Sequence, residues 1–158
     1  ASHTCLNLMH IDIYYWEQVC SDHVATIAAA CPLLEVVLLN ADSRDFQEAT
    51  IDAGVQALGL HCHHLRHLDL YLRRMHAAAE VLAEACVGWP NLRYLCADGS
   101  HCQEWGSTPE QECLPRALAK HCPLLEDFEL NHVPMAWKPI LEAGCPLLSP
   151  NCFGSAED

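Results

Sequence analysis

The nine residues C-H-H-L-R-H-L-D-L at positions 62–70 are one copy of a phrase that recurs along the chain. Its general form is C-x-x-L-x-x-L-x-L, and its last residues alternate between apolar and other types, as in a half-buried β-strand. Copies begin near residues 5, 31, 62, 89, 122 and 145, so they lie 26, 31, 27, 33 and 23 residues apart. Self-similarity at roughly 20–50 residues is typical of a solenoid, in which each repeat packs on the next.

The residues that precede the phrases favour helices. Residues 23–30 and 114–121 are two such runs, and residues 77–85 are rich in Ala, Glu and Leu. Each unit therefore reads as a strand, a loop and a helix. We predict one domain over residues 1–158, an α/β solenoid of about five to six repeats. Parallel strands are expected on its concave face and helices outside.

The phrase resembles the cysteine-containing leucine-rich repeat family, as in the repeat part of F-box/leucine-rich-repeat proteins. Apolar residues that the family places before the next Cys-Pro are present in the first unit as Ile13, Val19, Val24 and Ile27. The resemblance extends over nearly the whole chain and implies a leucine-rich repeat solenoid that binds another protein. For F-box proteins it implies substrate recognition in a ubiquitin ligase. The chain starts directly in its first phrase, so we expect no F-box segment within it.

The chain is strongly acidic. It holds 8 Lys and Arg against 21 Asp and Glu, a formal net charge of −13 at pH 7. Nucleic acids and anionic membranes attract clustered basic residues, so neither is an expected partner. No apolar run approaches the roughly 20 residues that span a bilayer. We expect a protein partner with a basic surface, and the alternative is that the acidity only maintains solubility.

The 11 cysteines are scattered singly, and an odd number cannot all pair within the chain. Free Cys behaves as a small buried hydrophobic residue, and Trp89 replaces it in one phrase. We therefore predict that most cysteines are reduced, buried and structural. That pattern favours an intracellular reducing compartment (cytoplasm, nucleus or organelle matrix) over secretion. The start of the chain also lacks the basic and apolar stretches of a signal peptide.

Alternate residues of each strand should point away from the helices, onto the concave face. These residues combine carboxylates with Tyr and His and include no Lys or Arg. We therefore predict that they form a partner-binding surface. The alternative is a solvent-exposed face that binds nothing. We expect acids on neighbouring strands to repel one another mildly. Cys96 is expected to face the same way. The predicted surface comprises His10, Asp12, Tyr14, Val36, Leu38, Asn40, His67, Asp69, Tyr71, Tyr94, Asp98, Asp127, Glu129 and Asn131.

One cluster has the residue types of a zinc site, namely His61, Cys62, His63 and His64. The repeat places Cys62 inward and the last two histidines on a surface turn, so their side chains should diverge. We predict no metal and no cofactor.

The sequence contains no phosphate-binding Gly loop, no H-E-x-x-H and no G-x-S-x-G motif. The acids are expected on an open face without a pocket, so we predict no catalytic residues and no enzyme activity. The expected function is a non-catalytic protein-interaction module, an accessory or scaffold subunit of a larger, multi-protein complex. Substrate recognition in an F-box-type ubiquitin ligase is the alternative.

Overall fold

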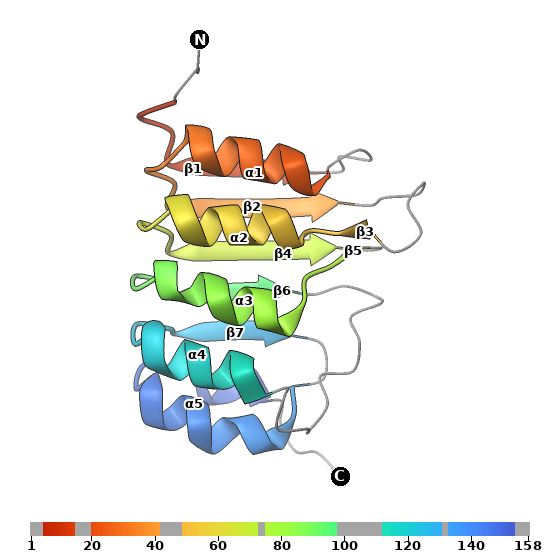
Figure 1. Ribbon diagram of the computed structural model, residues 1–158. Helices are drawn as coiled ribbons and strands as arrows, with labels where there is room; N and C mark the ends of the chain where they lie inside the picture. The colour runs from red at the N-terminus through yellow and green to blue at the C-terminus, as the bar shows by residue number, and fades with distance from the viewer. Residues whose placement is uncertain are drawn as a thin grey trace.

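The computed structural model of the chain describes residues 5–14, 20–41, 49–72, 75–97, 112–130 and 133–153. Five parallel strands form one sheet, in which strand order follows chain order (Figure 1). The strands are β1 (His10–Tyr14), β2 (Val36–Ala41), β4 (His67–Leu72), β6 (Tyr94–Ala97) and β7 (Asp127–Leu130). The predicted α/β class and the parallel pairing of consecutive phrases are confirmed.

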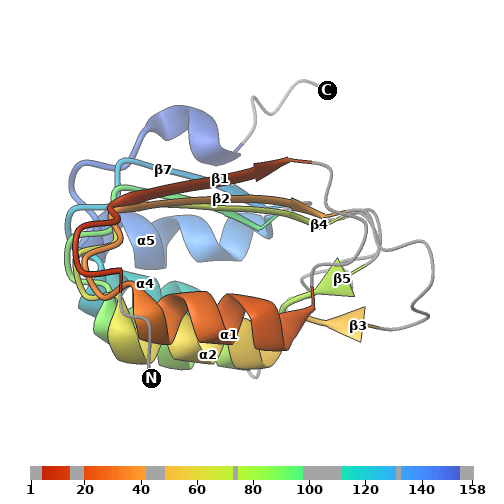
Figure 2. The ribbon, with the colours of Figure 1, turned by 90° about the horizontal axis from the view of Figure 1, so that it is seen from above.

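Five helices lie on one side of this sheet (Figure 2). They are α1 (Ser21–Ala30), α2 (Asp52–His61), α3 (Ala79–Ala85), α4 (Cys113–His121) and α5 (Lys138–Gly144). A 3-10 turn, η1 (Cys86–Gly88), continues α3, and another, η3 (Met135–Trp137), leads into α5. Each helix packs on the next one along the stack, so the arrangement is solenoid-like. The other side of the sheet, which we call the sheet face, points away from these helices (Figure 2).

The last phrase, residues 145–153, does not form a strand as the earlier copies do. It ends in the 3-10 helix η4 (Pro150–Phe153). The backbone ladder still reaches Ser149, whose N–H donates to the Glu126 carbonyl at 2.7 Å. Pro150 then stands where a strand would begin, and proline has no N–H for the ladder. This last copy of the phrase therefore lacks a strand.

A second, two-stranded parallel sheet was not predicted. It pairs β3 (Ala49–Thr50) with β5 (Met75–His76), both in the connections from strand to helix. Strands of two residues are too short to show a period-2 pattern in the sequence.

The apolar positions of the phrase form the core between sheet and helices. The first Leu of the phrase is fully buried in four copies, as Leu34, Leu65, Leu92 and Leu125. The corresponding Leu8 in the first copy is 39% exposed. The phrase thus has a common inward role, and its first copy is more open because it lies at the end of the described stack.

Six of the ten cysteines that the structure describes are buried, and none of these ten forms a disulfide. The thiol of Cys62 lies 3.7 Å from the carbonyl oxygens of Ala28 and Cys31, which end the preceding unit. Cys145 likewise donates toward the Cys122 carbonyl at 3.5 Å. Carbonyls at a helix end lack partners within the helix, and a thiol is a weak donor. In these copies, the Cys that begins the phrase therefore packs in the core and also offers a weak thiol donor to a carbonyl of the preceding unit. This second role adds to the packing role inferred from the sequence.

Candidate partner-binding face

Three rows of side chains cross the sheet face, because the strands pair in register. The first row contains His10, Val36, His67, Tyr94 and Asp127. The second contains Asp12, Leu38, Asp69, Cys96 and Glu129, and the third contains Tyr14, Asn40 and Tyr71. The predicted residues Asp98 and Asn131 lie outside the described residues, as does the side chain of Tyr14.

The second row separates its carboxylates. Leu38 lies between Asp12 and Asp69, and Cys96 lies between Asp69 and Glu129. Alternate strands are about 9–10 Å apart, comparable to the screening length of about 8 Å at physiological ionic strength. For these three acids, the expected repulsion between neighbouring strands is therefore wrong, since their immediate neighbours are uncharged.

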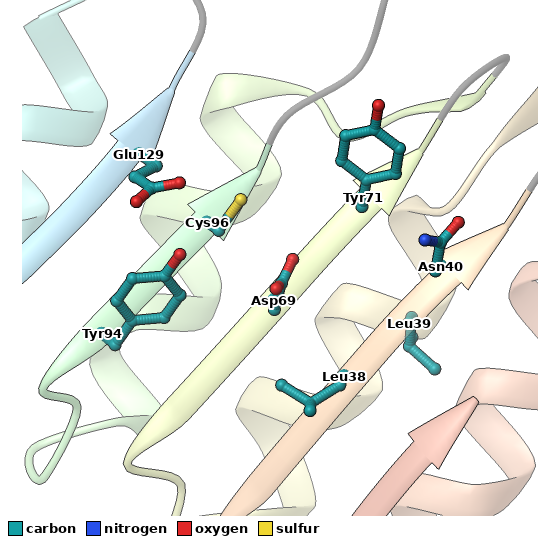
Figure 3. A pocket seen from close by; sticks show the side chains of 8 residues that line it. All are labelled: Leu38, Leu39, Asn40, Asp69, Tyr71, Tyr94, Cys96 and Glu129. Atoms are coloured by element: carbon teal, nitrogen blue, oxygen red, sulfur yellow. The ribbon is translucent and has the colours of Figure 1, made fainter. Parts of the chain in front are cut away.

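A hollow of about 260 Å³ opens on the sheet face (Figure 3). This corrects our expectation of an open face without a pocket. Six predicted residues line it, together with Leu39 and Cys96, which were not in the predicted set. Cys96 is only 4% exposed, although its outward position in the strand pattern was visible in the sequence. The lining residues are Leu38, Leu39, Asn40, Asp69, Tyr71, Tyr94, Cys96 and Glu129.

Two rings at one side of this hollow lie against each other. The centroids of His67 and Tyr94 are 4.2 Å apart, with 24° between the ring planes. Burial raises the pKa of the Tyr94 hydroxyl well above its usual range, and the charges of Cys96, Glu129 and Asp69 add to that effect. Burial lowers the pKa of His67, although Asp69 opposes the shift. Both rings are therefore uncharged at neutral pH.

Asp69 occupies the middle of the hollow, between Tyr94 and Tyr71 (Figure 3). Its Oδ1 is buried and has no hydrogen-bond partner. An unsatisfied buried polar atom costs about 1–3 kcal/mol. Among the described residues that line the hollow, two are acidic and none is Lys or Arg, so this part of its lining is negatively charged.

The described arginines nearest in sequence to these strands are paired elsewhere. Arg66 lies 3.7 Å from Glu35, and Arg93 forms an ion pair with Glu126. All four residues directly precede strands, and their backbones continue the ladder, with Arg66 N–H donating to the Glu35 carbonyl at 2.8 Å. The charges that precede β2, β4, β6 and β7 therefore run acid, base, base, acid, and each of the two arginines is paired with one of these acids, whereas the acids of the hollow are paired with neither arginine.

A second hollow, of about 580 Å³, lies on the helix side. It is more apolar in character, and Leu60 and Val87 beside it are 68% and 62% exposed. Its lining residues are Gln56, Gly59, Leu60, His63, Glu84, Ala85, Val87, Gly88 and Pro90. This groove between α2 and α3 is the other candidate surface.

The histidine-rich cluster is not drawn together. Cys62 is buried, whereas His63 and His64 are exposed, and Nδ1 of His63 lies 3.2 Å from the Gly88 carbonyl. Within the described residues, no group of three His, Cys, Asp or Glu side chains is placed to hold a metal ion. No helix among the described residues is long and apolar enough to cross a membrane.

No protein-family model matches the chain. The chain is similar to the F-box protein SKIP1 of Arabidopsis thaliana, with 28% identity over 104 residues. The match covers 58% of this chain and 34% of that protein. The chain thus spans about a third of the length of the curated relative that it matches.

Proposed function

We propose that this chain is a non-catalytic protein-interaction module of the leucine-rich repeat type, and that its sheet face binds a protein partner. The observation that carries this proposal is the hollow on that face, where two carboxylates and two tyrosines meet without a basic side chain among the lining residues. Tyr71 is 38% exposed and offers a large contact area with a polar tip. No cofactor and no catalytic role are proposed.

The similarity to an F-box protein favours one kind of module. We propose the substrate-recognition part of an F-box-type ubiquitin ligase, in which the sheet face selects the protein to be marked. A scaffold or accessory subunit of another complex is the second candidate, because the fold by itself supports both roles.

The proposed partner presents a basic surface. The net charge of −13 and the acids of the middle row favour it, whereas nucleic acid and membrane are disfavoured by the same charge. Exposed charge pairs contribute only about 0–1 kcal/mol each, so the acids should mainly set the encounter rate and the salt dependence. A buried aromatic anchor can contribute about 2 kcal/mol or more.

The proposed location is an intracellular reducing compartment. Its support is the state of the cysteines, since all ten that the structure describes are free thiols. Disulfides are rare where glutathione and thioredoxin keep thiols reduced.

The test is affinity capture from the native source, followed by mass spectrometry. The baits are the wild type, Tyr71→Ala, and the double variant Asp69→Asn/Glu129→Gln. The control is Glu80→Gln, which removes one negative charge from an exposed position on α3 that lines neither hollow. We expect a partner that the wild type and the control retain and both sheet-face variants lose. Ubiquitin-ligase subunits captured with the full-length parent protein would favour the first candidate. Equal recovery by all baits would rule out the sheet face and leave the helix-side hollow.

A further inference from the structure

We propose that the hollow on the sheet face takes a single arginine side chain of the partner, which lies against Asp69 and Glu129 and between Tyr71 and Tyr94. This inference rests on the proposed function, because it assumes that the sheet face binds a protein. It adds the residue that anchors the partner. A space of about 260 Å³ suits one long side chain better than a folded element.

The charges require a cation. Asp69 is half-buried, and its Oδ1 has no hydrogen-bond partner, so one of its two carboxylate oxygens is kept from water without compensation. Glu129 lies in the same row across Cys96 and adds a second negative charge. A guanidinium group carries five N–H donors and forms charge-assisted bonds with carboxylates, which are stronger than neutral hydrogen bonds. A cation in the hollow would therefore offset the cost of partly burying Asp69.

The walls favour arginine over lysine. Tyr71 from β4 and Tyr94 from β6 stand on opposite sides of Asp69 (Figure 3). The planar guanidinium stacks on aromatic faces and is more weakly hydrated than an ammonium group. Leu38 lies next to Asp69 in the row and supplies an apolar surface for the methylene stem. The hollow thus matches both parts of an arginine side chain.

The stacking of His67 on Tyr94 holds one wall in place. The two residues are paired across β4 and β6, and their rings lie 4.2 Å apart. A ring held by a neighbour loses less conformational freedom when a ligand arrives, which favours binding.

The experiment begins with a library of random linear peptides displayed on phage and selected against the purified chain. The tightest peptide is synthesised, and each of its arginines is replaced in turn by citrulline, which has the same shape without the charge. We expect one arginine whose replacement by citrulline weakens binding about tenfold or more. Replacement of the same arginine by lysine, which keeps the charge, should weaken binding less. Asp69→Asn should lower the affinity for the unmodified peptide to a similar degree. It should change the affinity for the citrulline peptide little further.

The control Glu80→Gln should leave affinity unchanged, and thermal unfolding of each variant should show that it is folded. If Tyr71→Ala abolishes binding but citrulline is tolerated at every position, the arginine proposal is overturned and the proposed function stands. If the selected peptides bind Tyr71→Ala and Asp69→Asn as well as the wild type, the sheet face is not the binding surface and both proposals fail.

Discussion

The imidazole of His67 stacks on the phenol ring of Tyr94, with 4.2 Å between centroids and 24° between planes. The contact spans two neighbouring strands of the sheet face, and Tyr94 lines the hollow on that face. Burial lowers the pKa of His67, so the folded state resists protonation of this imidazole.

This relationship predicts a loss of stability in mild acid. The pKa of His67 in the unfolded chain is about 6.5, above its value in the folded protein, so the unfolded state binds more protons as the pH falls through this range. The contribution of His67 is therefore fully present above about pH 6.5 and declines below it. Urea unfolding of the wild type should show a larger drop from about pH 7.5 to 5.5 than His67→Gln does. The exposed His63→Gln serves as control, and equal drops in the wild type and His67→Gln would contradict the prediction.

Replacing Asp69 by Leu should stabilise the fold while it damages the binding face. The change removes a buried oxygen without a partner and places an apolar side chain between Leu38 and Cys96. We expect a gain of about 1 kcal/mol in the free energy of unfolding, measured by urea denaturation. Asp12→Leu, at the exposed end of the same row, should change stability by less. A less stable Asp69→Leu protein would show that the carboxylate contributes to folding.

The buried thiols should be unreactive in the native state. Burial raises the pKa of Cys62 and of Cys145 to about 11, and the thiolate is the reactive form. At about pH 8 a thiol reagent should therefore modify exposed Cys5 rapidly and leave Cys62 and Cys145 intact until denaturant is added. Cys5→Ser should remove a fast-reacting group. Equal numbers of reactive thiols before and after denaturation would contradict the burial of these side chains.

Gly88 should not tolerate a side chain. A Cβ built there would lie 1.8 Å from the Gly59 carbonyl oxygen, and backbone on both sides limits relaxation. We expect Gly88→Ala to lower the free energy of unfolding by about 1–3 kcal/mol, as overpacking does. Val87→Ala is the matched control, since Val87 is 62% exposed in the same turn. A Gly88→Ala protein as stable as the wild type would contradict the close approach of η1 to α2 at Gly59.

Much of the architecture was predictable because one phrase carries it. Leu68 and Leu70 read as inward residues in the sequence, and both are 0% exposed. The phrase at residues 145–153 was less predictable, because its Leu and Cys positions match the others while Pro150 removes the donor that a strand needs. The family resemblance indicated protein binding. The hollow could be located only from the structure, because it forms where neighbouring strands pack side by side.

Local sequence determined which side of each strand faces the helices, since side chains alternate with a period of two and the apolar set must be buried. It therefore identified Asp69, Tyr71 and Tyr94 as residues of one face. The tertiary structure alone decided which of them meet. Repeat lengths vary between copies, and register is set by how each strand pairs with its neighbour, so lateral contacts do not follow from spacing along the chain. That pairing placed Leu38 and Cys96 between the acids, brought His67 against Tyr94, and left the Asp69 carboxylate in a hollow whose described lining residues include no Lys or Arg.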